Sequence, residues 1–572
     1  MAREIKELLG RIEQDKVLMA SFEKSVLSGG PVNITGLCEQ QKGYLIAALA
    51  YKFGKKPVVI VSDVTRAKAL SGGIAPFAGK DIPVLKPAEL SLVSAVASSH
   101  ENESERAGVI SKLLRADFDA AMICAPALLN KMPPAANVEK KFIKLSLGKN
   151  YDPVKLVSDL SERGYERVGM VSGQGEFSAR GDVIDVFPPD MDQPLRISFF
   201  DDEIDQLKTF NPDDQRSIEG MKKAVICPAY IYTYDEAERG RYADAMLHAA
   251  APDINKMNAS SNRTTAELLE RYTRADAEAV RQGMRISALG RWIGVINGDP
   301  RSVLGYVDRN KMILFVDEFS EARSRMDGYT ADFAARIKSA FEYGQAPSCS
   351  IESLFKAPDA MKALDKFGGA VTLACLKTAS SGLPGGETVD CKGMSEENWI
   401  GRDDALINYI KNGAGASSTD ITFMITGASR VDSFRNRMLE GGVDINVIPA
   451  ALPAGFEYPA AGLILIGEQE IFGSEKKHVQ KKSGGARITF FGDVAPGDYV
   501  VHDVHGIGLY EGIVNLKMGK SSQDYLKINY AKNAVIYLPV DKIDKLSKYV
   551  GPGGKSPKLS SLDSKEWKKN VE

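Results

Sequence analysis

The stretch VNITGLCEQQKGYLIAALAYKFGKKPVVIVSD, residues 32–63, decides the first part of the fold. It begins with an apolar segment and a Thr-Gly turn, continues through an Ala/Leu-rich run with helical character, and ends in a Val/Ile-rich strand. Strand, glycine turn and helix in this order are typical of a phosphate-binding loop (P-loop). The sequence therefore predicts a parallel α/β sheet with the frame of a nucleotide site.

The chemistry of that loop is incomplete. A P-loop needs glycines around the phosphates, a lysine for the β and γ charges, and Ser or Thr for magnesium. After Thr35 the segment supplies Gly36 only, and we assign the lysine position to Glu39 and the Ser/Thr position to Gln40. A carboxylate beside a triphosphate would repel it by ~4 kcal/mol per charge pair at ~4 Å and an effective dielectric constant of ~20. We expect a degenerate P-loop with no bound cofactor and no catalytic residue.

A second segment, MILFVDE (312–318), ends in two acids, as a magnesium-binding Walker B strand would. Asp317 and Glu318 would then face the phosphates. The alternative is a buried strand that ends in two solvated acids. We favour the alternative, because acids without a lysine partner have no phosphate to act on.

Apolar strands alternate with helical segments up to about residue 149. Residues 57–63, 81–86 and 119–126 have the continuous apolar character of buried parallel strands, and residues 104–117 have a helical pattern. This alternation indicates a parallel sheet with helices on its faces.

The composition excludes several classes of protein. A chain of 572 residues has room for roughly four domains, and its net charge of −2 gives no overall attraction to nucleic acid or membrane. No apolar run approaches the roughly 20 residues that span a bilayer. The six cysteines form no CxxC pair and the five histidines no HxxxH pair. We therefore expect a cytoplasmic protein without a disulfide framework or a bound metal.

The residue pattern changes from alternating strands and helices to short strands around Pro/Asp turns in the segment FSARGDVIDVFPPDMDQPLRISFFDDEIDQLKTFNP. Ile184 and Val186 are expected to face Leu195, Ile197 and Phe199 across an antiparallel pair. This pattern indicates an inserted domain built from hairpins.

The C-terminal part has the pattern of a small barrel, because GDYVVHDVHGIGLYEGIVNL, DYLKINY and NAVIYLPV are short strands separated by glycine turns. We interpret Gly497, Gly506, Gly508 and Gly512 as turn or bulge residues. His502 and His505 have no nucleophile or acid arrangement near them, and we interpret both as structural.

The chain is thus predicted to be a multidomain α/β protein with seven parts. These are an α/β domain, first part (1–149), an inserted antiparallel domain (150–222), the second part of the α/β domain (223–365), a small α/β spacer domain (366–473), a basic linker (474–489), a small barrel of the SH3/Tudor type (490–552) and the start of a helical connection (553–572).

Two blocks of the sequence resemble one known family, the transcription-repair coupling factors (Mfd). The inserted-domain segment is similar to a region that Mfd shares with the excision-repair protein UvrB. PGDYVVHDVHGIGLYEGI, together with DYLKINYAKNAVIYLPVDKIDKLSKYVG, resembles the CarD-like RNA-polymerase-interacting module of Mfd, which UvrB lacks. The final PKLSSLDSKEWKKNVE resembles the segment that leads into the translocase of the family. The resemblance covers nearly the whole chain.

The resemblance implies an adaptor in transcription-coupled nucleotide-excision repair. The barrel would bind the β subunit of RNA polymerase, and the inserted domain would recruit UvrA. Full-length relatives add a motor that uses ATP and magnesium to move along double-stranded DNA. No segment of this chain has the motifs of that motor, so we interpret it as an N-terminal portion, truncated at residue 572, that does not hydrolyse ATP. The family masks its UvrA-binding surface with a C-terminal domain, so this chain is expected to bind UvrA constitutively.

By resemblance, the UvrA-binding residues fall on Arg167 and Arg180, with Phe187 as an apolar anchor. Ser178 occupies another position that is arginine in UvrB. Arginine suits this role because its planar guanidinium can bind a carboxylate with two hydrogen bonds. The alternative is that Arg180 pairs with the acidic turn at residues 201–203 and that Phe187 belongs to the core.

The strand DYLKINY carries the candidate polymerase-binding residues. If Leu526 and Ile528 face the core, Tyr525 and Lys527 face outward, and an exposed edge there could pair with a strand of the partner. The sequence does not fix which face is outward, so all four residues remain candidates.

The basic linker either contacts DNA phosphates or serves solubility, and we favour solubility. Its cations are Lys476, Lys477, Lys481, Lys482 and Arg487.

Two other functions remain open. A UvrB-type ATP-dependent helicase or excision-repair subunit would bind nucleotide at residues 34–40, which Glu39 argues against. A free-standing CarD-like regulator would leave the first 470 residues without a role.

Overall fold

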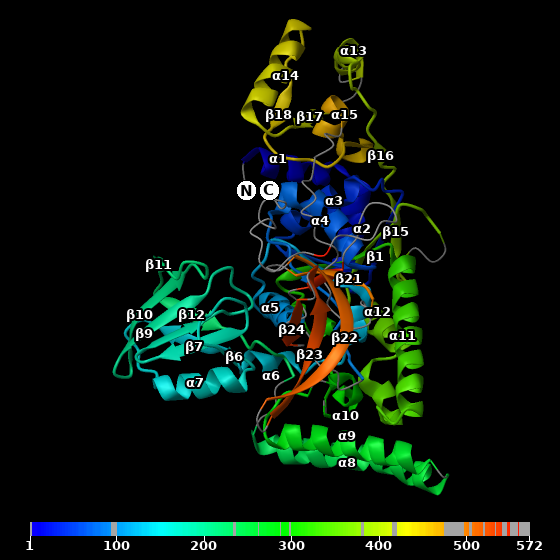
Figure 1. Ribbon diagram of the computed structural model, residues 1–572. Coiled ribbons are helices and arrows are strands. Elements are labelled where there is room, and N and C mark those ends of the chain that lie inside the picture. Colours follow the sequence, from blue (N-terminus) through cyan, green and yellow to red (C-terminus); the bar gives the residue numbers. More distant parts are fainter. Residues whose placement is uncertain are drawn as a thin grey trace.

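The computed structural model (Figure 1) describes residues 3–92, 100–232, 236–260, 262–286, 288–296, 299–378, 382–413, 420–473, 497–502, 506–518, 521–531, 534–539, 546–548 and 559. The basic linker expected at 474–489 lies outside these residues. So does the helical connection expected at 553–572, apart from residue 559.

A seven-stranded sheet forms the body of the molecule. Its strand order is β15-β1-β14-β13-β2-β4-β3, and every neighbouring pair is parallel. The parallel sheet predicted from the alternating strands and helices is thereby confirmed. The bounds are β1 (Val32–Thr35), β2 (Lys56–Val61), β3 (Val84–Leu85), β4 (Ala121–Cys124), β13 (Met312–Asp317), β14 (Val371–Leu373) and β15 (Glu387–Asp390).

The sheet continues beyond the boundary that we expected after residue 365. Strands β14 and β15 lie on either side of β1, although each is more than three hundred residues away from it in the sequence. Pairing between such remote segments leaves no local pattern in the sequence. The end of the α/β domain could therefore not be placed from the local residue pattern alone.

Helices cover both faces of the sheet, as strands with continuous apolar runs require. On one face, Val59 and Phe315 pack in a core with α1, α2, α3 and α4. On the other face, Ile60 and Leu314 share a core with α5 and α11, and the long hairpin formed by α8 and α9 joins this core through its contacts with α10. The bounds are α1 (Arg3–Gly10), α2 (Lys16–Ser28), α3 (Gln41–Lys52), α4 (Val64–Ala78), α5 (His100–Arg115), α6 (Ala135–Glu139), α8 (Glu236–Ala259), α9 (Arg263–Arg281), α10 (Ile293–Ile296), α11 (Phe319–Glu342) and α12 (Ala357–Asp365).

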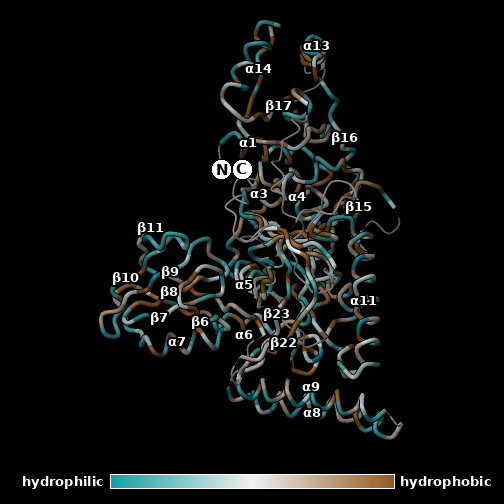
Figure 2. The backbone as a smooth tube through the Cα atoms, in the orientation of Figure 1, coloured by the Kyte–Doolittle hydropathy of each residue, from teal (hydrophilic) through white to brown (hydrophobic). Residues whose placement is uncertain are grey.

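The α8–α9 hairpin projects from the body, and Figure 2 shows teal and brown residues mixed along both helices, as expected for helices with one solvent-facing side. Within the described ranges, no helix combines the length and the apolar character needed to cross a membrane.

The inserted domain forms a six-stranded sheet of order β11-β10-β9-β8-β7-β6, packed on α7 (Pro153–Glu162). Ile184 pairs with Ile197 and Val186 with Leu195, which confirms the predicted register. A further pair, β5 with β12, lies at the two points where the chain enters and leaves this domain. The bounds are β5 (Ile143–Ser146), β6 (Glu166–Arg167), β7 (Glu176–Arg180), β8 (Val183–Val186), β9 (Leu195–Phe200), β10 (Glu203–Phe210), β11 (Ser217–Gly220) and β12 (Lys223–Ile226).

The inserted domain is fixed to α5 by a buried ion pair. Asp190, in the loop after β8, has no exposed side-chain surface and lies 2.5 Å from Arg115. The hydroxyl of Ser111 donates to the same carboxylate at 2.8 Å. Next to this contact Gly108 packs so closely on Pro189 that a Cβ at Gly108 would lie 2.3 Å from the Pro189 carbonyl oxygen. The domain is therefore docked on the body along this side.

The small α/β domain is a mixed sheet of order β16-β19-β20-β17-β18. We expected a plain spacer, but Phe456, Tyr458 and Leu465 share one core with Leu8 and Tyr44 of the body. The domain is therefore packed onto the body rather than tethered to it. The bounds are β16 (Met394–Ser395), β17 (Asp420–Met424), β18 (Asn446–Ile448), β19 (Phe456–Tyr458), β20 (Leu463–Gly467), α13 (Asp403–Gly413), α14 (Ala428–Glu440) and α15 (Glu468–Phe472).

The C-terminal sheet is antiparallel, with strand order β24-β23-β22-β21-β25. Its core contains Val500, Tyr510, Leu526 and Ile528. The bounds are β21 (Tyr499–His502), β22 (Gly506–Met518), β23 (Ser521–Asn529), β24 (Val535–Pro539) and β25 (Leu546–Lys548).

Candidate functional site

The loop between β1 and α3 retains the lysine of a P-loop. In the pattern G-x-x-x-x-G-K-[ST], with Gly36 as the first glycine, the lysine position falls on Lys42, the second glycine on Gln41 and the Ser/Thr on Gly43. The assignment of the lysine position to Glu39 and of the Ser/Thr position to Gln40 is therefore wrong. Helix α3 begins at Gln41, and its first turn is where this pattern places the lysine.

Lys42 is fully buried, and three carboxylates hold its ammonium group. The distance from Nζ is 2.8 Å to Asp317, 2.6 Å to Glu318 and 3.2 Å to Glu39. The expectation of two solvated acids after the apolar strand is also wrong, because Asp317 is buried and paired. The acids do have a lysine partner, and it is part of the protein.

Arg66, at the start of α4, completes this group. Its Nε lies 2.5 Å from Asp317 and its Nη1 2.5 Å from Glu39. We call Glu39, Lys42, Arg66, Asp317 and Glu318 the Lys42 cluster. Two cations face three carboxylates in it, so the charges nearly balance without a ligand.

The charges in the Lys42 cluster shift one another's pKa. Burial lowers the pKa of Lys42, but the carboxylates of Asp317 and Glu39 outweigh burial and raise it above the ordinary value. Burial raises the pKa of Glu318, but hydrogen bonds from Lys42 and the Cys375 N–H reverse the effect and lower it. Both groups are therefore held in their charged forms at neutral pH.

Other parts of the chain pack on the loop between β1 and α3. Gly43 packs on Gly73 of α4, and a Cβ at Gly43 would lie 2.3 Å from the Gly73 carbonyl oxygen. The N–H of Gly393 donates to the Gly36 carbonyl at 2.8 Å, and the Ser395 hydroxyl donates to Gln40 at 3.2 Å. These contacts join α3 to α4 and join the loop between β1 and α3 to the segment after β15. Among the described residues, no group of three His, Cys, Asp or Glu side chains could hold a metal ion.

In the inserted domain, Arg180 pairs with Asp185 on the next strand, at 2.9 Å. The alternative partner that we considered, the acidic turn at residues 201–203, is therefore wrong. Arg196 binds the same buried carboxylate at 2.7 Å and lies over the Phe210 ring at 4.4 Å. About half of the Arg180 side chain remains exposed, so its guanidinium can still reach a partner.

Arg167 and Arg180 lie on opposite faces of this sheet. Arg167 is exposed on the edge strand β6 and pairs in register with Phe177, whose side chain points into the core under the sheet. Arg180 is three residues further along β7 than Phe177, so its side chain points to the other face. The two arginines therefore do not form one flat patch.

Phe187 is buried, in a small cluster with Val171 and Phe210. The alternative that Phe187 belongs to a core is therefore confirmed, and its burial argues against the expected role as an apolar anchor for UvrA. Ser178 is buried as well, and its hydroxyl donates to the Gly169 carbonyl at 3.1 Å.

In the C-terminal sheet, β23 is an interior strand, paired with β22 on one side and β24 on the other. The expectation of a free edge at DYLKINY is therefore wrong. Leu526 and Ile528 are buried and cannot contact a partner, whereas Lys527 is partly exposed and pairs with Glu511 at 2.8 Å. The side chain of Tyr525 lies outside the described residues.

The outer strand next to β23 is β24, which the sequence reading did not select. Val535 and Tyr537 are about 40% exposed, at 38% and 43% respectively, although both are large apolar residues. Tyr537 lies directly across from Lys527 in the register. The signal in the sequence was the alternation in NAVIYLPV, which puts Val535 and Tyr537 on one face.

The glycines of this sheet behave largely as expected. Gly497, Gly506 and Gly512 have positive φ angles, of 101°, 76° and 127°, and Gly512 follows a bulge. Gly508 is needed for space, because a Cβ there would lie 2.4 Å from Ile528. His502 is buried, and His505 lies outside the described residues.

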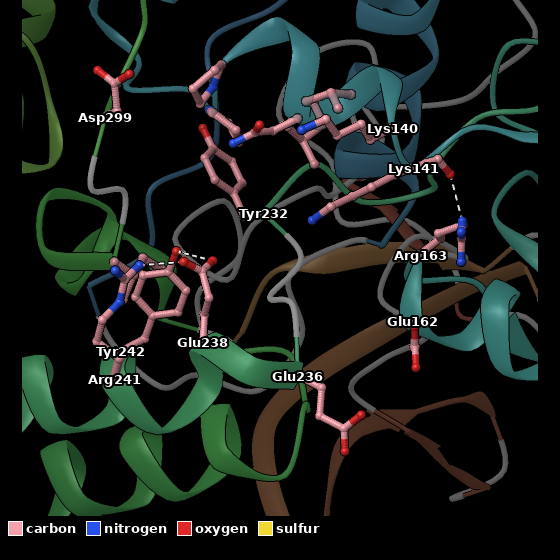
Figure 3. Close-up of a pocket in the computed structure, with 16 residues that line it drawn as sticks. Lys140, Lys141, Glu162, Arg163, Tyr232, Glu236, Glu238, Arg241, Tyr242 and Asp299 are labelled. Atoms are coloured by element: carbon pink, nitrogen blue, oxygen red, sulfur yellow. Dashed lines mark hydrogen bonds and ion pairs between the residues drawn. The ribbon is translucent and has the colours of Figure 1, made fainter.

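A cavity of about 760 Å³ lies between the inserted domain and the body. Figure 3 shows Arg163 bonded to the Lys141 carbonyl on one side, and Glu238 bonded to Arg241 and Tyr242 on the other. Its lining carries four cations and four acids, so the formal charges balance. The cations are Lys140, Lys141, Arg163 and Arg241, and the acids are Glu162, Glu236, Glu238 and Asp299.

Matches to known protein families fall on the inserted domain and on the C-terminal sheet. Residues 143–232 match the family model described as the UvrB interaction domain, and residues 494–550 match the CarD-like/TRCF RID domain. Transcription-repair-coupling factors of Bacillus subtilis and Staphylococcus aureus are 27% and 25% identical to the chain over 94% of its length. The chain spans about half of these relatives, with 46% of each covered. The resemblance to the N-terminal part of a transcription-repair coupling factor is thereby confirmed.

Proposed function

We propose that this chain is an adaptor in transcription-coupled nucleotide-excision repair, which binds the β subunit of RNA polymerase with its C-terminal sheet and UvrA with its inserted domain. The observation that carries the proposal is the match of two separate β domains to a UvrB interaction domain and a CarD-like/TRCF RID domain, in one chain. The C-terminal sheet is proposed to close as a barrel of the SH3/Tudor type.

The body serves as the platform between these two domains. The Lys42 cluster supports this role, because its lysine is neutralised by carboxylates of the protein and its Ser/Thr position is a tightly packed glycine. We propose that the chain alone neither binds nor hydrolyses ATP. The ATP, magnesium and DNA translocation of the full-length relatives would belong to segments that this chain does not match.

UvrA binding is proposed to involve the exposed guanidiniums of Arg167 and Arg180, while Phe187 supports the loop from inside. The test is calorimetric titration of UvrA with single alanine variants. Each arginine variant is expected to weaken binding roughly 10-fold or more. Arg216→Ala, an exposed arginine of the same domain, is the matched control. Unchanged binding in both Arg167→Ala and Arg180→Ala would exclude both arginines from the UvrA contact.

Polymerase binding is proposed to use the edge of β24 that pairs with no strand among the described residues, with Tyr537 and Lys527 on the adjoining face. An exposed strand edge can extend a sheet of the partner through main-chain hydrogen bonds. Tyr537→Glu and Lys527→Glu are expected to reduce capture of the polymerase β subunit. Tyr343→Glu, on an exposed tyrosine of the body, is the control. If the polymerase β subunit is still captured after both changes, its binding site lies elsewhere on the chain.

A UvrB-type ATP-dependent subunit is the second candidate, and the retained Lys42 is the specific observation that favours it. Titration with a fluorescent ATP analogue and magnesium separates the two. Saturable binding that Lys42→Met abolishes would favour the second candidate. No binding up to roughly 1 mM nucleotide would favour the adaptor.

A further inference from the structure

Asp185, in the inserted domain, is a buried carboxylate with a guanidinium on either side. It lies on β8, an interior strand that pairs with β7 and β9. Arg196 is directly across from it on β9. Ser178 is directly across from it on β7, and Arg180 follows Ser178 by two residues, so Arg180 is a diagonal neighbour on the same face of the sheet.

Arg196 fixes the orientation of the Asp185 carboxylate. Its Nε donates to one carboxylate oxygen at 2.7 Å and its Nη2 to the other at 2.9 Å. Arg196 is itself held, since its Nη1 donates to the Gln215 carbonyl at 3.1 Å and its Cζ lies 4.4 Å from the centre of the Phe210 ring. The carboxylate therefore offers Arg180 an anchor with a defined direction.

Arg180 uses this anchor with a small part of its hydrogen-bonding capacity. Its Nη2 donates to Asp185 at 2.9 Å, and about half of its side chain is exposed. A guanidinium has five N–H donors in a planar fork. Arg180 can therefore keep its bond to Asp185 and still present a pair of N–H groups to a carboxylate outside the domain.

The group also keeps a net positive charge, because two guanidiniums share one carboxylate. The hydroxyl of Ser178 donates to the Gly169 carbonyl at 3.1 Å rather than to Asp185, so it does not compete with Arg180 for the carboxylate. A side chain that is already ordered loses less conformational entropy on binding than a free one. An anchored Arg180 should therefore bind a carboxylate more tightly than an unanchored one.

We infer that Asp185 is a positioning residue for UvrA binding, which orients Arg180 toward a carboxylate of UvrA without touching UvrA itself. The inference rests on the proposed contact between Arg180 and UvrA. Because Asp185 is buried in the middle of the sheet, its effect on a partner passes through the side chains that it holds.

A double-mutant cycle with the full chain tests the inference. UvrA binding is measured by calorimetric titration in the wild type, in Asp185→Asn, in Arg180→Ala and in the combination of the two. Asp185→Asn is expected to weaken binding roughly 3- to 10-fold, because Arg180 loses its charged anchor. In the Arg180→Ala background, the same change is expected to alter the affinity by less than about twofold. A purely structural role of Asp185 would give equal losses in both backgrounds.

Asp182→Asn is the matched control, because Asp182 is exposed at the turn of the same hairpin, and it is expected to leave binding unchanged. Circular dichroism checks the fold of each variant. If Asp185→Asn does not fold, Asp185→Asn combined with Arg196→Gln repeats the cycle, since this pair removes the carboxylate together with the guanidinium that depends on it most.

Three results would overturn the inference and leave the proposed UvrA contact in place. These are equal losses in the two backgrounds, unchanged or tighter binding in Asp185→Asn, and a loss of similar size in Asp182→Asn. Unchanged binding in Arg180→Ala alone would overturn both the contact and the inference.

Discussion

Replacing Lys42 by methionine tests whether the Lys42 cluster is structural. The change keeps most of the side-chain volume but leaves Asp317 buried beside one remaining cation, Arg66. Breaking a buried ion pair by removing one partner costs about 3–5 kcal/mol. Because Arg66 still binds Asp317 through two nitrogens, we expect a loss at the lower end, about 3 kcal/mol.

Amide hydrogen exchange in β1 and β13 is the appropriate assay, because a chain of several domains has no single unfolding free energy. A loss of about 3 kcal/mol corresponds to exchange roughly 150-fold faster in these strands. Lys52→Met is the matched control. It lies on the same helix, but its pair with Glu13 is partly exposed and should contribute about 0–1 kcal/mol.

Combining Lys42→Met with Asp317→Asn removes both partners of the pair. The double variant is expected to be more stable than the two single losses predict, because no uncompensated charge is left. Exchange in the Lys42→Met protein that stays within twofold of the wild type would refute the structural interpretation. Lys42 would then be available for a ligand.

Three further predictions follow from packing and burial. Gly43→Ala should destabilise the body by about 2 kcal/mol or more, because its Cβ would meet the backbone of Gly73; normal thermal unfolding of this variant would contradict the packing. Burial, with help from Glu457, raises the pKa of Glu396 to about 7, above its ordinary 4.5. The folded state therefore binds the extra proton, and stability should fall as pH rises from about 4.5 to about 7, by up to ~3 kcal/mol. Glu396→Gln should flatten this dependence in unfolding measured across that range. Asp190→Asn should weaken the docking of the inserted domain by about 3 kcal/mol, which would appear as faster amide hydrogen exchange in α5. Unchanged amide exchange would show that the ion pair does not hold the domain in place.

Local patterns in the sequence gave the strands of the body and the hairpin register of the inserted domain correctly. Continuous apolar runs identified β2, β4 and β13, and period-two alternation paired Ile184 with Ile197. These predictions succeed because the apolar residues of a strand show, without reference to its partners, which sides of that strand are buried.

Features that depend on remote partners could not be predicted in this way. Nothing in DYLKINY shows that β24 covers its far side, and nothing near Arg180 shows that Asp185 rather than the acidic turn is its partner. Lys42 is different, because counting the P-loop spacing from Gly36 finds it. Its burial by Asp317 and Glu318, some 275 residues away, is visible only in the fold.

The position of β1 between β14 and β15 has a consequence for synthesis on the ribosome. Strand β1 ends at Thr35, but its neighbours begin only at Val371 and Glu387. At roughly 5–20 residues per second, the first strand waits about 20–70 s before either neighbour has been made. During that interval an apolar segment has no sheet to join, so a nascent chain of this protein should depend on chaperones until the second half emerges.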